Sequence, residues 1–85
     1  MWYLYLVRCH DGSLYTGIST DVDRRLSMHA GNRGARRLRG RGPLHLVYAR
    51  AIGDRSLASR IEYRVKRLSR EDKERLIAGN LQLPL

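Results

Sequence analysis

The sequence is poor in cysteine, in long apolar runs and in acidic residues, and each shortage excludes a class of protein. Cys9 is the only cysteine among 85 residues, so the chain can build neither an internal disulfide framework nor a multi-cysteine zinc site. No apolar stretch is long enough to cross a membrane, and Met1-Trp2-Tyr3 lacks the basic start of a secretory signal. These features predict a cytoplasmic protein in a reducing setting.

The shortage of acidic residues leaves a strong positive charge. Eight Asp and Glu stand against seventeen Lys and Arg, which gives a formal net charge of +9. Such a charge on a short chain indicates a polyanionic partner, and nucleic acid is the first candidate. A membrane surface ranks well below it, because no predicted helix combines a basic face with Trp or Phe on the opposite face. The sequence indicates no obligate protein partner.

The length of the chain limits what it can bury. Eighty-five residues are enough for a single domain, 1–85, and for no second core. We expect the core to occupy about 2–68, and a C-terminal helix and tail to occupy 69–85. A domain of this size buries only about 60 to 65% of its unfolded surface. The functional site is therefore expected to be a shallow surface.

Two β-rich segments near the N-terminus, 2–9 and 14–18, predict a hairpin, since Asp-Gly between them is a turn signal. Its register depends on the loop. If only Asp11 and Gly12 turn, Tyr5 and Tyr15 point to opposite faces of the sheet. If 10–12 form a three-residue loop with Gly12 in the left-handed conformation, the tyrosines gather on one face. We favour the second register.

In the favoured register Tyr3, Tyr5 and Tyr15 share one face, and leucines and Ile18 line the other. Gly17 then lies opposite Tyr5 and leaves a bare patch of backbone that a ligand, such as nucleic acid, could approach. Strand tyrosines are more often amphipathic core residues with their hydroxyls at the surface. Taken alone, the tyrosines would have that structural role.

The next segment predicts a helix over about 21–30, with Thr20 as its N-cap and Asp23 completing a capping-box pattern. Arg25 and His29 lie four residues apart and therefore share a stripe along its flank. Because this helix follows directly on a strand, Arg25 is expected to reach the exposed tyrosine face. An arginine there would suit phosphate, since its planar guanidinium always carries a proton.

The stretch 31–42 is the most basic part of the chain. Four glycines disfavour a long helix there, and an ordered but adaptable loop is expected. So dense a run of positive charge is better explained by phosphate binding than by solvation alone. The residues that would bind phosphate are Arg33, Arg36, Arg37, Arg39 and Arg41.

The remainder predicts a third strand and two helices. The strand, over 44–51, has Leu44, Leu46 and Tyr48 on one face and should pair antiparallel with the first strand. Helices follow over about 55–68, capped by Asp54, and over about 70–78, capped by Ser69. The predicted fold class is therefore α+β, a three-stranded antiparallel sheet flanked by helices, with the first strand central.

Glu62 lies at the edge of the buried stripe of the helix over 55–68. Its structural explanation is an ion pair, either with Lys66 at the favourable i, i+4 spacing or with Arg55 or Arg64. Its functional explanation is metal binding, which becomes the better one once the tyrosines and Arg25 are in place.

The order of these residues resembles the signature of the GIY-YIG nucleases, and within them the small single-domain branch similar to Slx1-type enzymes. The resemblance covers about 2–68, with Tyr3-Leu4-Tyr5 and Tyr15-Thr16-Gly17 as the two triplets. It departs from the pattern at Tyr3, where the family has glycine, and near the C-terminus, where Asn80 is a poor match for a family asparagine. The catalytic residues it implies are Tyr3, Tyr5, Tyr15, Arg25, His29 and Glu62.

The resemblance implies hydrolysis of phosphodiester bonds, in DNA more than in RNA. Glu62 would bind one divalent ion, Mg²⁺ or Mn²⁺, as its only protein ligand, while Arg25 would stabilise the phosphate charge. The general base stays open between Tyr5, Tyr15 and His29. The alternative is a non-catalytic module that binds nucleic acid, in which the same arginines bind phosphate and the tyrosines stack on bases.

Overall fold

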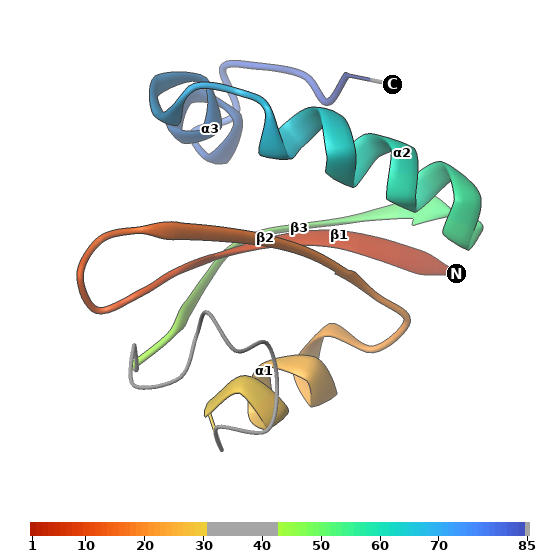
Figure 1. Ribbon diagram of the computed structural model, residues 1–85, viewed down its shortest axis with the longest axis horizontal. Helices are drawn as coiled ribbons and strands as arrows, with labels where there is room; N and C mark the ends of the chain where they lie inside the picture. The colour runs from red at the N-terminus through yellow and green to blue at the C-terminus, as the bar shows by residue number, and fades with distance from the viewer. Residues whose placement is uncertain (31–42, 85) are drawn as a thin grey trace.

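The computed structural model describes residues 1–30 and 43–84 and forms one three-stranded antiparallel sheet with helices on both faces (Figure 1). The strand order is β2-β1-β3, so the first strand is central. The elements in chain order are β1 (Trp2–Arg8), β2 (Leu14–Ser19), α1 (Val22–Ala30), β3 (His45–Gly53), α2 (Arg55–Lys66) and α3 (Arg70–Ile77). The α+β class and the central position of β1 are confirmed.

The hairpin adopts the three-residue loop. The Cys9 amide donates to the Ser13 carbonyl at 2.8 Å, and Gly12 has φ +85°. Tyr5 consequently lies opposite Gly17, as the favoured register requires. Tyr3, Tyr5 and Tyr15 therefore share one face of the sheet, and that prediction is confirmed.

Gly12→Val is expected to destabilise the fold by about 1–2 kcal/mol, because a β-branched residue is strained at positive φ. A Cβ atom there would meet only the Arg70 guanidinium, at 3.8 Å, so the expected cost is one of backbone conformation and not of space. Gly12→Asn is the matched control, since asparagine tolerates the left-handed region. Urea denaturation measures both. Equal losses for Val and Asn would show that the backbone conformation at this position is not the cause.

The side chains of β3 do not alternate regularly between the two faces of the sheet. Irregularities in its pairing with β1 place Tyr48 opposite Leu6 but Leu46 opposite Val7. Because Leu6 and Val7 point to opposite faces, Leu46 and Tyr48 do so too, and the expectation that they share a face is wrong. The extra residue of the bulge causes the change, since it resets the two-residue period.

The helix starts follow side-chain capping. In α1 the carboxylate of Asp21 accepts from the Arg24 amide at 3.1 Å, so Asp21 and not Thr20 caps the helix. Both residues are good caps, and the shift by one residue corrects the prediction. Asp54 caps α2 by accepting from the Leu57 amide at 2.8 Å, and Ser69 caps α3, as predicted.

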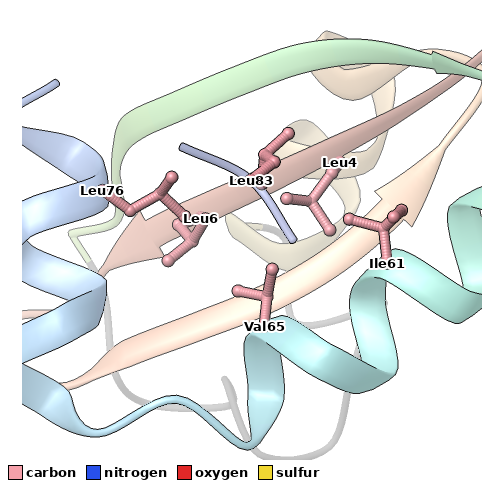
Figure 2. Packing of buried hydrophobic residues seen from close by; sticks show 6 residues of the cluster. All are labelled: Leu4, Leu6, Ile61, Val65, Leu76 and Leu83. Carbon is pink, nitrogen blue, oxygen red and sulfur yellow. The ribbon is translucent and has the colours of Figure 1, made fainter. Parts of the chain in front are cut away.

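The helices cover the two faces unequally. In Figure 1, α2 and α3 lie on one face of the sheet and α1 on the other. The main core lies under α2 and α3, and its members come from β1, both helices and the C-terminal tail (Figure 2): Leu4, Leu6, Ile61, Val65, Leu76 and Leu83. The core therefore extends beyond residue 68, because Leu83 is buried in it.

An ion pair with two hydrogen bonds joins α3 to the hairpin. The Arg8 guanidinium donates from both terminal nitrogens to the two carboxylate oxygens of Glu74, each at 2.7 Å. This pair lowers the pKa of Glu74 below its ordinary value. Arg70 adds a hydrogen bond of 2.7 Å to the Gly12 carbonyl. The hairpin loop and the last helix are thus joined directly.

Candidate active site

The candidate residues meet at one edge of the sheet. β2 is an edge strand, and both α1 and α2 contact it, although the two helices lie on opposite faces (Figure 1). Side chains from both faces can therefore come together only around this edge. Arg25 comes from α1 and Glu62 from α2, while Tyr5 comes from the central strand.

Tyr5 reaches the edge because Gly17 has no side chain. A Cβ atom on Gly17 would lie 2.5 Å from the Tyr5 Oη and 2.6 Å from its Cζ. The Tyr5 ring therefore lies across Gly17, and only 1% of the tyrosine is exposed. Two expectations are corrected: Tyr5 is not an exposed tyrosine, and Gly17 does not offer a bare patch, since the Tyr5 ring occupies that space.

The hydroxyl of Tyr5 is where the candidates act on one another. Its pKa is raised to about 12, mainly because burial penalises the phenolate, and Tyr15 adds to the rise. Arg25 opposes it through its charge and a hydrogen bond to the Tyr5 side chain, and the negative charge of Glu62 adds a smaller rise. Four of the six predicted catalytic residues, Tyr5, Tyr15, Arg25 and Glu62, thus interact electrostatically at this hydroxyl.

Tyr5 is expected to titrate near pH 12 in the folded protein, against about pH 10 for free tyrosine. The folded chain holds this proton more tightly than the unfolded chain, so the stabilising contribution is present below about pH 10 and lost as pH rises toward 12. The phenolate absorbance of the parent minus that of Tyr5→Phe, read after a rapid pH jump, isolates this step. A step near pH 10 in the folded protein would contradict the burial of Tyr5.

Glu62 forms the ion pair that its spacing predicts. Its carboxylate lies 3.5 Å from the Lys66 ammonium, and the two side chains are 22% and 51% exposed. An exposed pair of this length contributes roughly 1 kcal/mol at most. The pair with Lys66 is therefore weak, and the partly exposed carboxylate also acts on the Tyr5 hydroxyl through its charge.

The donor set suits a hard divalent ion better than zinc. Residues 1–30 and 43–84 contain no cluster of three His, Cys, Asp or Glu side chains that could bind a metal. Structural zinc needs four such ligands, and catalytic zinc needs three. Mg²⁺ keeps several waters and needs only one or two carboxylates together with substrate phosphate. Glu62, accessible and weakly paired, fits that requirement.

The other predicted site residues fall into three groups. Tyr3 shares the face of Tyr5 but lines a separate cavity of about 330 Å³, together with residues of the α1 start and of β3. His29 lies one turn after Arg25 in α1, but its side chain is outside the described part of the chain. Outside it as well are Arg33, Arg36, Arg37, Arg39 and Arg41.

Two residues that the sequence analysis did not assign to the site, Trp2 and Arg55, line a cavity next to it. The Arg55 guanidinium lies over the Trp2 ring, 5.5 Å from its centroid. Both side chains line a cavity that Arg25 also lines. The sequence feature that could have identified Arg55 is its place at the first position of a helix, where an acidic residue is preferred.

Comparison with known families decides the classification. The family model described as the GIY-YIG catalytic domain matches residues 1–75. The chain belongs to the GIY-YIG family. This GIY-YIG domain is 57% identical over 77 residues to UPF0213 protein YhbQ of Escherichia coli K12, a match that covers 91% of the chain and 77% of the relative. The corresponding protein of Salmonella typhimurium is 58% identical over 76 residues, covering 89% and 76%.

A solved structure supports the same classification. The domain resembles the solution NMR structure of UPF0213 protein BH0048 from Bacillus halodurans with a TM-score of 0.59 and 51% identity. The match covers 92% of this chain and 84% of the other. The predicted family and α+β fold are thus confirmed, and the chain carries a domain of the GIY-YIG nuclease superfamily. Among the described residues, no helix is both long and apolar enough to cross a membrane.

Proposed function

We propose that this GIY-YIG domain is a metal-dependent endonuclease that hydrolyses phosphodiester bonds in nucleic acid, with DNA as the first candidate. One observation carries the proposal. Tyr15, Arg25 and Glu62 come from both faces of the sheet, and all three act electrostatically on the Tyr5 hydroxyl, to which Arg25 is also hydrogen-bonded. Each of them has a structural explanation alone, but together they supply distinct parts of a hydrolytic site.

Arg25 is suited to the charge that develops on phosphate. Its guanidinium offers a planar fork of donors and keeps its proton at any working pH. It already donates to the Tyr5 side chain, which helps to hold it in place. A donor that is positioned before the substrate arrives needs little reorganisation when charge builds up on the non-bridging oxygens.

Glu62 would hold the divalent ion, and Mg²⁺ or Mn²⁺ bound there would neutralise phosphate charge and assist the leaving group. The carboxylate must exchange its ion pair with Lys66 for this role. That exchange costs little free energy, since the two charged atoms are 3.5 Å apart and the lysine side chain is 51% exposed. The released ammonium of Lys66 remains on the same face of α2.

Tyr5 is best suited to donating a proton. With a pKa of about 12, only about one molecule in 10⁵ carries its phenolate at pH 7. Because arginine can only donate, the Tyr5 oxygen accepts from Arg25, and its own proton is directed to another acceptor, such as the attacking water or a phosphate oxygen. The general base is then Tyr15 or His29.

Cleavage of a panel of labelled nucleic acids tests the proposal. Single-stranded, duplex, flapped and branched DNA, and the RNA equivalents, are incubated with Mg²⁺, with Mn²⁺ and with EDTA. We expect cleavage with at least one metal and none with EDTA. Binding without cleavage of any substrate would instead support the non-catalytic nucleic-acid-binding module.

A further inference from the structure

A polar cavity adjoins the candidate active site. It has a volume of about 310 Å³ and is lined by Trp2, Ile18, Ser19, Thr20, Arg25 and Arg55. Arg25 is shared, since the same guanidinium acts on the Tyr5 hydroxyl. A group bound in this cavity would therefore lie next to the phosphate that Arg25 is proposed to bind.

The charges around this cavity favour an anion. Its described lining contains two guanidiniums and two hydroxyl side chains, and no carboxylate. The two acids adjacent in sequence to lining residues act as helix caps: Asp54 accepts from the Leu57 amide and Asp21 from the Arg24 amide. The first turn of α2 contains no acidic residue and begins with Arg55, so beyond the capping carboxylate of Asp54 no acid in that turn offsets the positive helix end.

The cavity also offers a flat aromatic surface. Trp2 is partly exposed, and the Arg55 guanidinium lies over its ring at 5.5 Å from the centroid. A cation–π contact between exposed groups is weak, so Arg55 can exchange it for a phosphate. An indole face combined with two arginines is the combination with which proteins bind a nucleotide whose base is unstacked. Bases inside a duplex cannot reach such a surface.

We propose that Trp2 and Arg55 form a subsite for one unpaired nucleotide next to the phosphate bound by Arg25. Its base stacks on the indole, and Arg55 binds its phosphate. This inference rests on the proposed function and narrows its substrate class to nucleic acid with an unpaired nucleotide at the cleaved bond. A fully paired duplex would place a phosphate at Arg25 but would place no nucleotide in the subsite of Trp2 and Arg55.

Binding is tested in EDTA, so that the result does not depend on cleavage. Trp2 is the only tryptophan in the chain, and its fluorescence therefore reports on this subsite alone. We expect short single-stranded DNA or RNA to quench it, and a blunt duplex with the same number of phosphates to bind with little quenching. Equal quenching by single strand and duplex would overturn the proposal.

Two substitutions, each with a control, measure the contribution of the subsite. Loss of one stacked base corresponds to roughly a 5- to 150-fold weaker affinity, and we expect this for single strands with Trp2→Leu. Trp2→Phe keeps an aromatic face and should retain most of the affinity, which separates stacking from misfolding. Arg55→Gln is compared with Arg67→Gln, because Arg67 lies over the Tyr63 ring at the same 5.5 Å but lines no part of this cavity.

The outcomes separate the subsite from the catalytic proposal. Arg55→Gln should weaken single-strand binding more than Arg67→Gln does, and both should affect duplex binding alike. Quenching with no cleavage of any substrate would support the subsite and reject the nuclease. Cleavage by a Trp2→Leu protein with unchanged preference for single strands would support the nuclease and reject the subsite.

Discussion

Replacing Glu62 with glutamine is expected to reduce cleavage by at least about a hundredfold, because the charge stabilisation from a bound metal ion is worth several kcal/mol. Glutamine keeps the shape of the side chain and loses the charge that holds a divalent ion. The fold should remain, since the ion pair with Lys66 is partly exposed and contributes little. Affinity for nucleic acid should remain or rise, because the chain loses one negative charge. Cleavage rates measure the activity, fluorescence anisotropy measures the affinity for nucleic acid, and circular dichroism measures the retention of the fold.

Glu71→Gln is the matched control for this experiment. Glu71 is an exposed glutamate in the first turn of α3, so its substitution changes the net charge equally. The Glu71→Gln protein should cleave nucleic acid at the parental rate. If Glu62→Gln and Glu71→Gln cleave equally fast, Glu62 does not bind a catalytic ion, and its role is limited to the ion pair with Lys66.

Adding one methyl group at Gly17 is expected to destabilise the fold by about 1–3 kcal/mol and to disturb the site at the same time. In Gly17→Ala the new Cβ would lie 2.5 Å from the Tyr5 Oη, so the buried ring must move. A moved ring loses its position beside Arg25, and cleavage should fall together with stability. Urea denaturation and the cleavage assay measure the two effects.

A double-mutant cycle shows whether the Tyr5 ring is the cause. Tyr5→Leu removes the ring and has its own cost in stability, since it empties part of a buried site. In that background Gly17→Ala should cost little, because the atoms it would meet are gone. The two changes are therefore expected to be strongly non-additive. Additive losses would show that Gly17 is needed for a reason other than the ring of Tyr5.

Local patterns predicted the hairpin well. Asp-Gly placed the turn, and the tyrosine spacing selected the register with Gly12 at positive φ, which the structure confirms. The placement of Glu62 at the edge of a buried stripe also followed from helical periodicity, and its predicted pairing with Lys66 is present. These features depend on one short hairpin loop and on one turn of a single helix, where sequence spacing determines geometry.

Features that depend on distant residues were missed or misplaced. Nothing in the β3 sequence marks the bulge that turns Leu46 away from Tyr48, because the bulge arises in the pairing with β1. The Tyr5 ring is buried because it lies across Gly17 on the neighbouring strand. The spacing of residues within one strand does not reveal this contact, and it predicts an exposed tyrosine instead. The sequence also gave no indication that Arg25 and Glu62 would approach from opposite faces of the sheet.

The contacts of β1 have a consequence for how quickly the site can form. Arg8 pairs with Glu74, 66 residues away, and Leu4 and Leu6 share a core with Leu83. A two-stranded hairpin is marginal alone in water, so β1 and β2 depend on these distant partners. Non-local contacts of this kind slow folding, because a long loop must close before they form. The candidate site would therefore remain incomplete, although Tyr5 and Arg25 come early in the chain, until residues as late as Leu83 have joined the core.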